Sequence, residues 1–525
     1  MPENDWIFLY GSPGSGKSSI GRLVGQALAL PFVDLDLEIE KSSGMSIPDV
    51  FALQGETAFR RVERETLQRL LTDLQPGVLA LGGGALLDAG NQALVSSYGP
   101  VVCLSASLDT LQERLRSDAP NRPLLSGDLV SRLAELLNKR SEHYTSFSLQ
   151  FRNEEFSLEQ AAWNVQVLLG RFHVRGMGAG YDVWVIPGEL DRFGQALSSR
   201  GLRGPVALVC DEHVGPLYAD RVLHSLRSAG LETYMVKVQA GEQHKNIQTV
   251  QALWEGFLQA GLERNSTVVA LGGGVTVDLA GFAAATFMRG VAWVAAPTSL
   301  LAMVDASLGG KTGADLPQGK NLVGAFYPPR FVLADLQALS TLPEREVRSG
   351  MAEVIKAAII ADPELLNTCA LGLEMVTTHW EEIVPRAMAV KVCFIQADPY
   401  EKGPRAALNL GHTVGHALER VSDYKISHGE AVSIGMVMEA FLAEQIGLAQ
   451  VGLAARIASI LAGFGLPTHI PSGLKWEAIL AAMQADKKHQ AGSLCFTLPA
   501  AIGDVRTGVL LKPQELASFA KICGE

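Results

Sequence analysis

The stretch that most constrains the fold lies near the N-terminus, where residues 11–18 read GSPGSGKS. It matches the pattern G-x-x-x-x-G-K-[ST], follows the apolar run WIFLY and precedes SIGRLVGQALAL, whose apolar residues recur with a helical period. Strand, glycine-rich loop and helix in this order are the context that a phosphate-binding loop requires. Backbone N–H groups of the loop and the helix N-terminus favour a bound phosphate. The sequence therefore predicts an α/β domain that binds a nucleotide.

The residue types around this loop suit phosphoryl transfer. Lys17 can neutralise the outer phosphates and Ser18 can ligate Mg²⁺. Asp34 and Asp36 end the next apolar stretch, where an Asp-x-Asp pair serves either a bound ligand or simply a helix cap. Arg60 stands next to Arg61 and close to Glu63, so a solvated helical face is the alternative to a ligand contact there.

Five further stretches occur in one order along residues 5–170. They read FVDLDLEIE, GETAFRRVE, LALGGG, NRPLL and NKRSEHY. Together with the loop they closely resemble shikimate kinase, with Leu35 standing where that family has a small hydroxyl residue. The resemblance implies that ATP with Mg²⁺ and shikimate are the substrates, and that two arginines hold the carboxylate of the small acid.

The resemblance also implies a role for each matching position of the first part. ATP would contact Gly11, Gly14, Ser15, Gly16, Lys17, Ser18 and Ser19. Shikimate would contact Asp36, Arg60, Gly82, Gly83, Gly84 and Arg140. Mg²⁺ would lie near Ser18 and Asp34, while Lys17 and Arg122 would be catalytic, with Arg122 closing over the phosphates.

Size, charge and cysteine usage limit the classes of protein to which this chain can belong. The chain has 525 residues, enough for two to four domains. Its net charge of −11 argues against a general nucleic-acid surface but leaves room for local sites that bind anions. The six cysteines are scattered and no segment is long enough to span a bilayer. We therefore expect a cytoplasmic enzyme with neither nucleic-acid nor membrane partners.

A new series of predicted elements begins near residues 171–178. There the sequence RFHVRGMGAGYDVWVIPG is first glycine-rich and then typical of a strand. VALVCDEHV is a further predicted strand, and it ends at Asp211, which is placed to accept a ribose hydroxyl. STVVALGGGVTVDLAGFAAATFMRG predicts strand, glycine turn and helix, although it lacks a regular G-x-G-x-x-G. Taken alone, this triple glycine fits a tight packing turn as well as a dinucleotide site.

Two decapeptides nearly repeat each other, LALGGGALLD at residues 79–88 and VALGGGVTVD at residues 269–278. Their flanking motifs share nothing else. We therefore interpret the two triple glycines as one physical solution used twice, because glycine lets the backbone approach a ligand closely, and not as a duplicated module.

Metal ligands are predicted in the last third of the chain. Glu353 and Lys356 lie one turn apart on a predicted helix, where an ion pair is the simpler alternative. His412 and His416 share a helical face at i,i+4, and His428 follows shortly after. Histidines and a carboxylate carried on helices suit a catalytic zinc with an open position. Spacing alone does not say which histidines ligate.

Residues 178–525 together closely resemble 3-dehydroquinate synthase. The resemblance implies bound NAD⁺ and a divalent metal, zinc or cobalt, held by Glu353, His412 and His428. The NAD site would include Asp211, Glu242, Lys245, Gly273, Gly274, Asp278, Thr298, Ser299 and Lys320. The substrate would meet Arg289, Asp305, Lys311, Asn321, Lys356, Lys391, Arg405, Asn409 and Lys488, with catalytic roles for Lys311, Lys356, Arg405 and His416. A homodimer is implied as well, in which Arg405 reaches the neighbour's active site.

The prediction for the whole chain is a bifunctional α/β enzyme of the shikimate pathway. We expect a P-loop kinase domain with a parallel sheet at 1–172, an α/β NAD-binding domain at 178–342 and a mainly helical metal- and substrate-binding domain at 343–525. The kinase would phosphorylate shikimate, and the lyase would convert a heptulosonate phosphate to 3-dehydroquinate and phosphate. The alternatives are a related sugar-phosphate cyclase or polyol dehydrogenase, and a nucleotide-binding regulatory domain without turnover.

Overall fold

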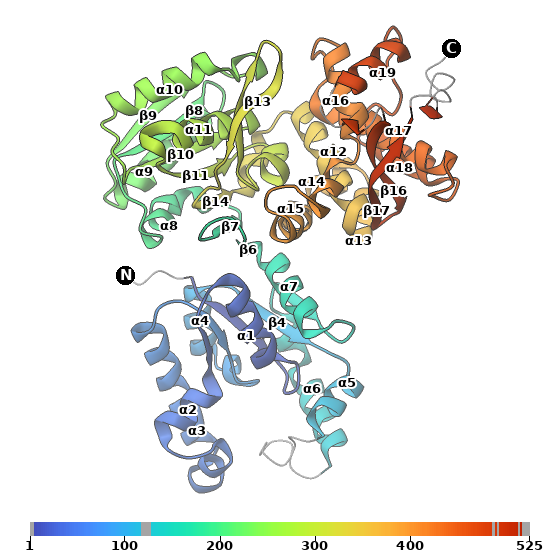
Figure 1. Ribbon diagram of the computed structural model, residues 1–525. Helices are drawn as coiled ribbons and strands as arrows, with labels where there is room; N and C mark the ends of the chain where they lie inside the picture. Colours follow the sequence, from blue (N-terminus) through green and yellow to red (C-terminus); the bar gives the residue numbers. More distant parts are fainter. Residues whose placement is uncertain (1–4, 117–127, 486–488, 491–492, 513–514, 517–525) are drawn as a thin grey trace. The chain divides into compact units, whose positions relative to one another are not determined.

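The computed structural model divides into two compact units, Met1–His173 and Val174–Glu525 (Figure 1). It describes all residues except 1–4, 117–127, 486–488, 491–492, 513–514 and 517–525. The boundary falls within the stretch 171–178, along β6 (Arg171–Val174), where the sequence pattern resets.

The first unit is built on a five-stranded, wholly parallel sheet in the order β2-β3-β1-β4-β5. Its strands are β1 (Ile7–Gly11), β2 (Phe32–Asp34), β3 (Val78–Ala80), β4 (Val101–Ser105) and β5 (Leu149–Arg152). Its helices are α1 (Lys17–Leu28), α2 (Leu35–Ser43), α3 (Ile47–Asp73), α4 (Ala89–Tyr98), α5 (Leu108–Leu115), α6 (Leu129–Thr145) and α7 (Leu158–Leu169), with a short 3₁₀ turn η1 (Ala85–Leu87).

Apolar residues of the central strand β1 point alternately to two separate cores. Phe8 and Tyr10 join one cluster with α2, α3 and α4, while Ile7 and Leu9 join the other with α1 and α7. The carboxyl ends of β1, β2 and β3 therefore lie at one edge of the sheet, which is where open α/β sheets bind their ligands. The predicted strand, loop and helix are present, because β1 ends at Gly11 and α1 begins at Lys17.

The second unit begins with a seven-stranded sheet in the order β6-β7-β14-β11-β10-β8-β9, in which the pairs from β7 onward are parallel. Besides β6, these are β7 (Tyr181–Val185), β8 (Val206–Asp211), β9 (Thr233–Val238), β10 (Thr267–Gly272), β11 (Ala292–Pro297) and β14 (Phe331–Ala334). The sheet is accompanied by α8 (Phe193–Ser199), α9 (Asp220–Ser228), α10 (Ile247–Gln259) and α11 (Gly274–Thr286). An antiparallel hairpin, β12 (Lys311–Leu316) and β13 (Gly319–Phe326), follows the short turn η8 (Ala302–Ala306).

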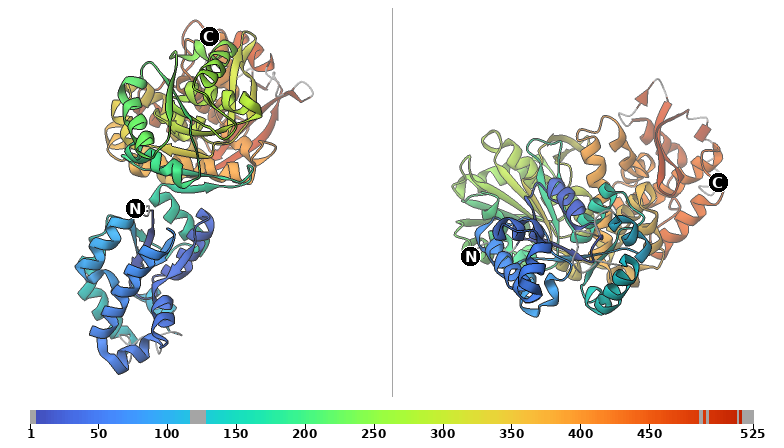
Figure 2. Two further views of the ribbon diagram at one scale, coloured as in Figure 1. Left: turned by 90° about the vertical axis from the view of Figure 1, so that its left-hand side faces the viewer. Right: turned by 90° about the horizontal axis from the view of Figure 1, so that it is seen from below.

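The rest of the second unit is mainly helical and lies beside the α/β part (Figure 2). Its helices are α12 (Glu344–Ala361), α13 (Pro363–Cys369), α14 (Leu373–Thr377), α15 (Trp380–Ala397), α16 (His412–Val421), α17 (His428–Gln445), α18 (Leu453–Gly463) and α19 (Trp476–Ala485). The sequence did not predict the small antiparallel sheet of β15 (His489–Gln490), β16 (Ser493–Ala501) and β17 (Asp504–Leu511). Leu494, Phe496 and Leu498 of β16 pack into the same cluster as α16 and α17, so this sheet covers the helical core.

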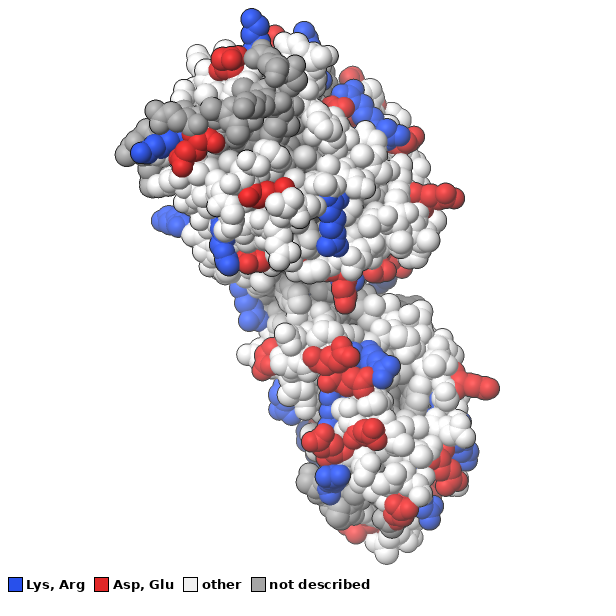
Figure 3. All heavy atoms as spheres, turned by 90° about the vertical axis from the view of Figure 1, so that its right-hand side faces the viewer, with Lys and Arg blue, Asp and Glu red and all other residues white. Residues whose placement is uncertain are grey.

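The surface and the helices add two observations. On the face drawn in Figure 3, acidic and basic side chains are interspersed. Among the helices in the described parts of the chain, none has both the length and the hydropathy to cross a membrane.

Helices α12, α16 and α17 pack with unusually close backbones. A β-carbon at Gly435 of α17 would lie 2.0 Å from the carbonyl oxygen of Gly411, which precedes α16. A β-carbon at Gly429, at the start of α17, would lie 2.3 Å from the carbonyl oxygen of Ser349 in α12. Real side chains do not tolerate such distances, so glycine at both positions sets how near the three helices approach.

We predict that Gly435→Ala destabilises the second unit by about 3 kcal/mol, because the methyl group must push α17 away from the Gly411 carbonyl. Gly463→Ala is the matched control, since nothing lies within 4 Å of the β-carbon added there, at the end of α18. That change should be neutral or stabilise by up to about 1 kcal/mol. Urea titration followed by hydrogen exchange of α16 and α17 peptides measures both. An unshifted midpoint in Gly435→Ala would contradict this account of the packing.

Candidate active sites

The phosphate-binding loop and the predicted magnesium residues meet at the end of β1. The Nζ of Lys17 donates to the carbonyl oxygens of Gly11 at 3.0 Å and Ser12 at 2.9 Å. The Oγ of Ser18 lies 2.5 Å from Oδ2 of Asp34, while Oδ1 of Asp34 accepts from the backbone N–H of Asp36 and so caps α2. Asp34 therefore caps α2 with one oxygen and faces Ser18 with the other, while its role toward Mg²⁺ stays a prediction.

A buried asparagine anchors the loop from the far side. The Nδ2 of Asn153 donates to the carbonyl oxygen of Ser15 at 2.6 Å, and its Oδ1 accepts from Arg114 at 3.0 Å. Gly14 and Gly16 have positive φ angles of 78° and 88°, which allow the loop to turn around the space where phosphates would bind. Sequence reasoning missed Asn153, because a residue that fixes the backbone from outside a motif leaves no mark within it.

The first triple glycine faces the predicted acceptor residues. A β-carbon at Gly82 would lie 3.0 Å from Oδ1 of Asp36, and one at Gly84 would lie 2.7 Å from Nη2 of Arg60. The carbonyl oxygen of Gly83 accepts from Nη1 of Arg140 at 2.9 Å and from the Tyr144 hydroxyl at 2.7 Å. The structure therefore brings together all the predicted acceptor residues: Asp36, Arg60, Arg140, Gly82, Gly83 and Gly84.

Glu63 is a further residue of this cluster. Its side chain is only 1% exposed, and its Oε2 accepts from Nη1 of Arg60 at 2.7 Å. Burial raises the pKa of Glu63, and the Arg60 charge opposes that rise. The interpretation of Arg60 and Glu63 as a solvated helical face is therefore wrong. Arg122, the predicted lid residue, lies outside the described residues.

The predicted metal residues of the second unit come from three different helices. Glu353 lies on α12, His412 begins α16 and His428 begins α17, and one potential ligand atom from each lies within 4.8 Å of the others. Oε1 of Glu353 is 3.4 Å from Nε2 of His428 and 3.8 Å from Nε2 of His412. Nδ1 of His412 lies 3.1 Å from the Leu410 carbonyl oxygen, so that nitrogen donates and Nε2 is left for the cluster.

In this cluster, burial and neighbouring charges act on the pKa values of His428, His412 and Glu353. Burial would lower the pKa of His428, but its contacts with Glu353 and Glu419 raise it to about 10. Burial, with Lys356 nearby, holds the pKa of His412 well below its usual range. Burial would raise the pKa of Glu353, yet the ion pair with Lys356 keeps it lowered. Lys356 therefore forms the ion pair that spacing suggested, and this pair lies within the site itself.

His416 lies beside these residues on the outer side. Its ring centroid is 5.1 Å from that of His412, and the side chain is exposed. With Glu419 and His428 it forms a second group whose potential ligand atoms lie within 4.8 Å of one another. Sequence reasoning missed Glu419, which is buried on α16 and contacts both His428 and Lys320.

Two of the predicted substrate lysines, Lys391 and Lys311, are placed against carboxylates. Lys391 contacts Asp305 of η8, and Lys311 contacts Glu401. Burial would raise the pKa of Asp305, but Lys391 and Lys356 hold it well below its usual range. Asn409 donates to Oε1 of Glu401 at 3.0 Å. Glu401 therefore joins two predicted substrate residues, although no sequence motif pointed to it.

The second triple glycine opens α11, as predicted, and has hydroxyl side chains around it. Ser299 Oγ would lie 3.5 Å from a β-carbon at Gly273, and the N–H of Thr298 donates to the Gly272 carbonyl oxygen at 2.9 Å. This differs from the first triple glycine, which is followed only by the short turn η1. The different surroundings agree with two independent uses of glycine.

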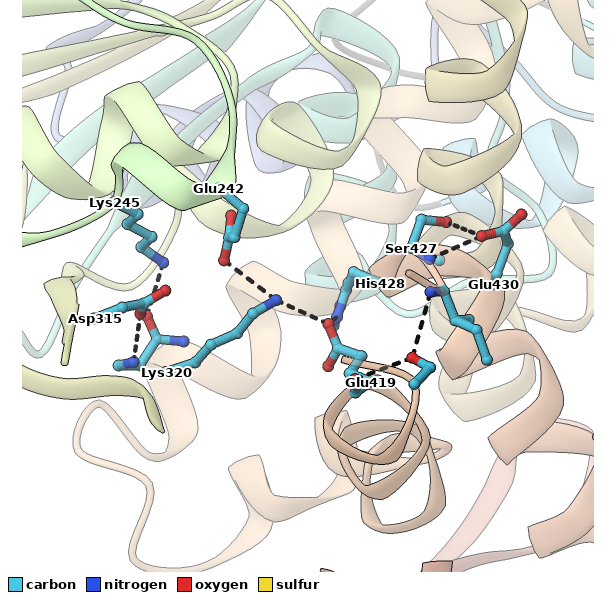
Figure 4. A network of polar contacts seen from close by, with 12 residues as sticks. Glu242, Lys245, Asp315, Lys320, Glu419, Ser427, His428 and Glu430 are labelled. Carbon is cyan, nitrogen blue, oxygen red and sulfur yellow. Dashed lines mark hydrogen bonds and ion pairs between the residues drawn. The ribbon is translucent and has the colours of Figure 1, made fainter. Parts of the chain in front are cut away.

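A charged cluster lies beside this turn. Lys245 is buried, and its Nζ lies 2.6 Å from Oδ2 of Asp278 and 2.7 Å from Oδ1 of Asn321. Lys320 lies 3.3 Å from Oε1 of Glu242 and 3.1 Å from Oε1 of Glu419 (Figure 4). The predicted nucleotide residues Glu242 and Lys320 are thereby linked to the predicted metal residue His428 through Glu419.

Asp211 ends β8, and its carboxylate already has hydrogen-bond partners within the chain. Its Oδ1 accepts from the backbone N–H groups of His213 and Val214, both at 2.9 Å, and its Oδ2 accepts from Thr276 at 3.3 Å. Both oxygens therefore hold the loop after β8 and the start of α11. A ribose contact for Asp211 stays a prediction.

Two arginines depart from the predicted grouping. Arg405 was expected to reach a neighbour's active site, but only 2% of it is exposed and its Nη1 donates to the Pro399 carbonyl oxygen of its own chain. That expectation is wrong for Arg405, because the side chain is enclosed by its own protomer. Arg289 is exposed and forms no hydrogen bond or ion pair with another described residue. Lys488 lies outside the described residues.

Comparisons with known proteins match both units. The family model of shikimate kinase matches residues 13–167, and those of the N-terminal and C-terminal parts of 3-dehydroquinate synthase match 235–349 and 350–489. The 3-dehydroquinate synthase of Nostoc punctiforme is 43% identical over 332 residues, which covers 62% of this chain and 92% of that protein. The synthase of a Synechocystis species is 45% identical over the same shares of each chain.

Solved structures of related cyclases match the second unit. A 2-deoxy-scyllo-inosose synthase complexed with carbaglucose-6-phosphate, NAD⁺ and Co²⁺ is 26% identical, with a TM-score of 0.61 over 67% of this chain and 99% of that one. A 2-epi-5-epi-valiolone synthase from Streptomyces hygroscopicus, with NAD⁺ and Zn²⁺ bound, is 27% identical, with a TM-score of 0.61 over 66% of this chain and 98% of that one. The higher identities to 3-dehydroquinate synthases disfavour another cyclase or a polyol dehydrogenase.

Fold and sites define a two-part α/β enzyme, a P-loop phosphotransferase followed by a lyase with a cluster of potential metal ligands. The chain belongs to the 3-dehydroquinate synthase family and carries a shikimate kinase domain before it, which makes it a bifunctional enzyme of the shikimate pathway.

We predict that Glu63→Gln lowers the kinase kcat/KM for shikimate about tenfold, because the buried charge that fixes Arg60 is lost, a change of about 1.4 kcal/mol. Glu56→Gln is the matched control. Glu56 also contacts Arg60, at 3.4 Å, but is 58% exposed. An exposed ion pair is worth less than about 1 kcal/mol, so this variant should stay within about twofold of the wild type. Steady-state kinetics of both variants is the measurement, and equal losses would contradict a special role for Glu63.

Proposed function

We propose that the first unit transfers the γ-phosphoryl group of ATP to shikimate at the carboxyl edge of its sheet. Lys17 and the loop amides from Gly11 to Ser19 hold the phosphates, and Ser18 with Asp34 holds Mg²⁺. Asp36 receives the acceptor hydroxyls, while Arg60 and Arg140 hold the carboxylate. The close approach of Gly82 to Asp36 and of Gly84 to Arg60 supports this, because glycine at both positions places no side chain of its own beside these groups.

We propose that the second unit makes 3-dehydroquinate from a heptulosonate phosphate, with a divalent metal held by Glu353, His412 and His428. One observation carries the metal assignment. Oε1 of Glu353 is buried, has no hydrogen-bond partner among the described residues and faces two histidine nitrogens. Two histidines and one carboxylate are the ligands of many catalytic zinc sites, and cobalt suits the same set. When bound, the metal would supply Lewis-acid stabilisation of a substrate oxygen.

The nucleotide part of this proposal rests on the cluster next to α11. NAD⁺ would lie against Gly273 and Gly274, with its hydroxyls and phosphates near Lys245, Asp278, Glu242, Thr298, Ser299 and Lys320. The N-terminus of α11 favours the pyrophosphate. The solved cyclases that match this unit support the proposal, because they were determined with NAD⁺ and a divalent metal.

The remaining residues bind and orient the phosphorylated acid. Lys311, Lys391, Arg405 and Asn409 surround the proposed pocket, and Lys311 and Lys391 are each already held by a carboxylate. The positions of these cations are therefore set before substrate binds. His416, exposed beside the metal residues, would exchange a proton with the substrate phosphate through a ring nitrogen. We assign the three parts to residues 1–172, 178–342 and 343–525.

Two further proposals concern the state of the enzyme. We propose a homodimer built by the second unit, on the resemblance to the synthase family. The buried Arg405 gives that dimer no support as a shared catalytic residue. We also propose a cytoplasmic location, supported by the absence of disulfides among the five described cysteines.

We predict that a strong chelator abolishes the lyase activity and that Zn²⁺ or Co²⁺ restores it, because Glu353, His412 and His428 then lose the ion they hold. The shikimate kinase activity of the same sample, assayed in excess Mg²⁺ after the chelator is removed, should survive. Metal analysis and both assays are the measurements. Full lyase activity in metal-free protein would refute the assignment.

The reciprocal variants are the control for that experiment. Lys17→Ala should remove kinase activity and leave lyase kcat within about twofold, since a barrier change below about 0.4 kcal/mol is hard to resolve. His412→Ala should do the reverse. A tenfold loss in the untouched activity of a folded variant would show that the two sites are coupled.

We predict a dimer in solution at assay concentrations, and light scattering of the full chain measures its mass. The same measurement on a truncated chain that lacks the first unit should also give a dimer. A monomeric full chain with full lyase activity would exclude the proposed assembly.

A further inference from the structure

The two ring nitrogens of His428 face two different carboxylates. Nε2 lies 3.4 Å from Oε1 of Glu353, and Nδ1 lies 3.7 Å from Oε1 of Glu419. The same Oε1 of Glu353 also lies 3.8 Å from Nε2 of His412, so Nε2 of His428 is the atom available to the proposed metal. The other nitrogen can then only carry a proton, and Glu419 is the acceptor placed to receive it.

Glu419 is well placed for this because it shares α16 with His412. The two residues are seven positions apart, which is close to two helical turns, so both project from the same face of the helix. Helix α17, which carries His428, packs against α16 at the Gly435 contact. Glu419 is only 4% exposed, so water competes little for its carboxylate.

Lys320 holds Glu419 in turn. Its Nζ lies 3.1 Å from the same Oε1 of Glu419 and 3.3 Å from Oε1 of Glu242 (Figure 4). It also lies over the Tyr424 ring, 4.6 Å from the ring centroid. An ionised carboxylate buried to this extent needs a countercharge, which Lys320 supplies from β13. The chain of contacts therefore runs from the nucleotide side, at Glu242, through Lys320 and Glu419 to His428.

A second metal ion is the competing explanation, because His416, Glu419 and His428 also form a ligand group. Such an ion would need Nδ1 of His428 while the first ion uses Nε2, so the ring would have to lose its last proton. It would also have to displace the ammonium of Lys320 from Glu419. Both requirements are costly, and a proton on Nδ1 needs neither.

We propose that Glu419 is a positioning residue that orients His428 and fixes its proton on Nδ1, with Lys320 holding Glu419 in place. This inference rests on the proposed metal site at Glu353, His412 and His428. Carboxylates that accept from a metal-bound histidine orient the ring and raise its basicity, and their loss typically weakens metal binding about 10–100-fold.

The test compares three full-length proteins, the wild type, Glu419→Gln and Glu430→Gln. Glu430 is the matched control because it is a second glutamate next to His428. It caps α17 by accepting from the N–H and Oγ of Ser427 at 2.8 and 2.7 Å (Figure 4), and glutamine can keep both contacts. Each metal-free protein is titrated with Co²⁺, read by its visible absorption, and with Zn²⁺ against a competing chelator.

The expected result is one ion per chain in all three proteins, with a dissociation constant about 10–100-fold higher in Glu419→Gln and within about twofold of wild type in Glu430→Gln. The visible bands of bound Co²⁺ should shift only in Glu419→Gln, because only there does the ring lose its orienting carboxylate. Unchanged affinity and unchanged bands in Glu419→Gln would overturn the inference.

The remaining outcomes separate this inference from the proposed function. Two ions per wild-type chain, with one lost in Glu419→Gln, would make Glu419 a ligand and overturn the positioning role. A wild type that binds no ion would refute the metal site itself. If Glu419→Gln does not fold, Glu419→Asp decides the question. Aspartate keeps the negative charge but moves the carboxylate oxygen away from His428. We expect several-fold weaker metal binding in this variant, and wild-type affinity would overturn the inference.

Discussion

Close approach of a glycine backbone to its neighbours is the constraint on which both proposed active sites depend. In the first unit, the triple glycine at residues 82–84 passes so near the side chains of Asp36 and Arg60 that an added β-carbon would require them to move. In the second unit, Gly435 and Gly429 let α17 approach the backbones of Gly411 and Ser349. His412 and His428 begin their helices at these contacts, so the spacing of the metal residues follows from the spacing of the helices.

The second requirement is compensation of buried charge. The proposed lyase site gathers several cations, and burying those such as Lys356 and Lys391 without partners would be prohibitive. The structure pairs Lys356 with Glu353, Lys391 with Asp305 and Lys311 with Glu401. These pairs lie along elements from both parts of the second unit. An overall acidic chain therefore supports an anion-binding site, because the positive charge is local and held by its own counterions.

The errors of prediction have a common physical origin. Glu63, Glu401 and Glu419 were missed because each acts through a residue brought near it by folding, and no motif requires a carboxylate at those positions. Arg405 was expected to extend to a neighbouring subunit, yet it is enclosed by its own chain. The contacts of Asp211 with the backbone and with Thr276 also arise only on folding, and its ribose contact stays a prediction.

The sequence alone determined the two classes of unit, and it predicted their boundary region and a set of chemistry-bearing residues. It could do so because phosphate loops, triple glycines and paired histidines impose their requirements on neighbouring positions in the chain. Only the tertiary structure decided which carboxylate each cation contacts, which nitrogen of His428 faces the metal residues and which glycines set the helix spacing. Those choices depend on contacts such as Lys320 with Glu419, 99 positions apart, which local sequence patterns cannot specify.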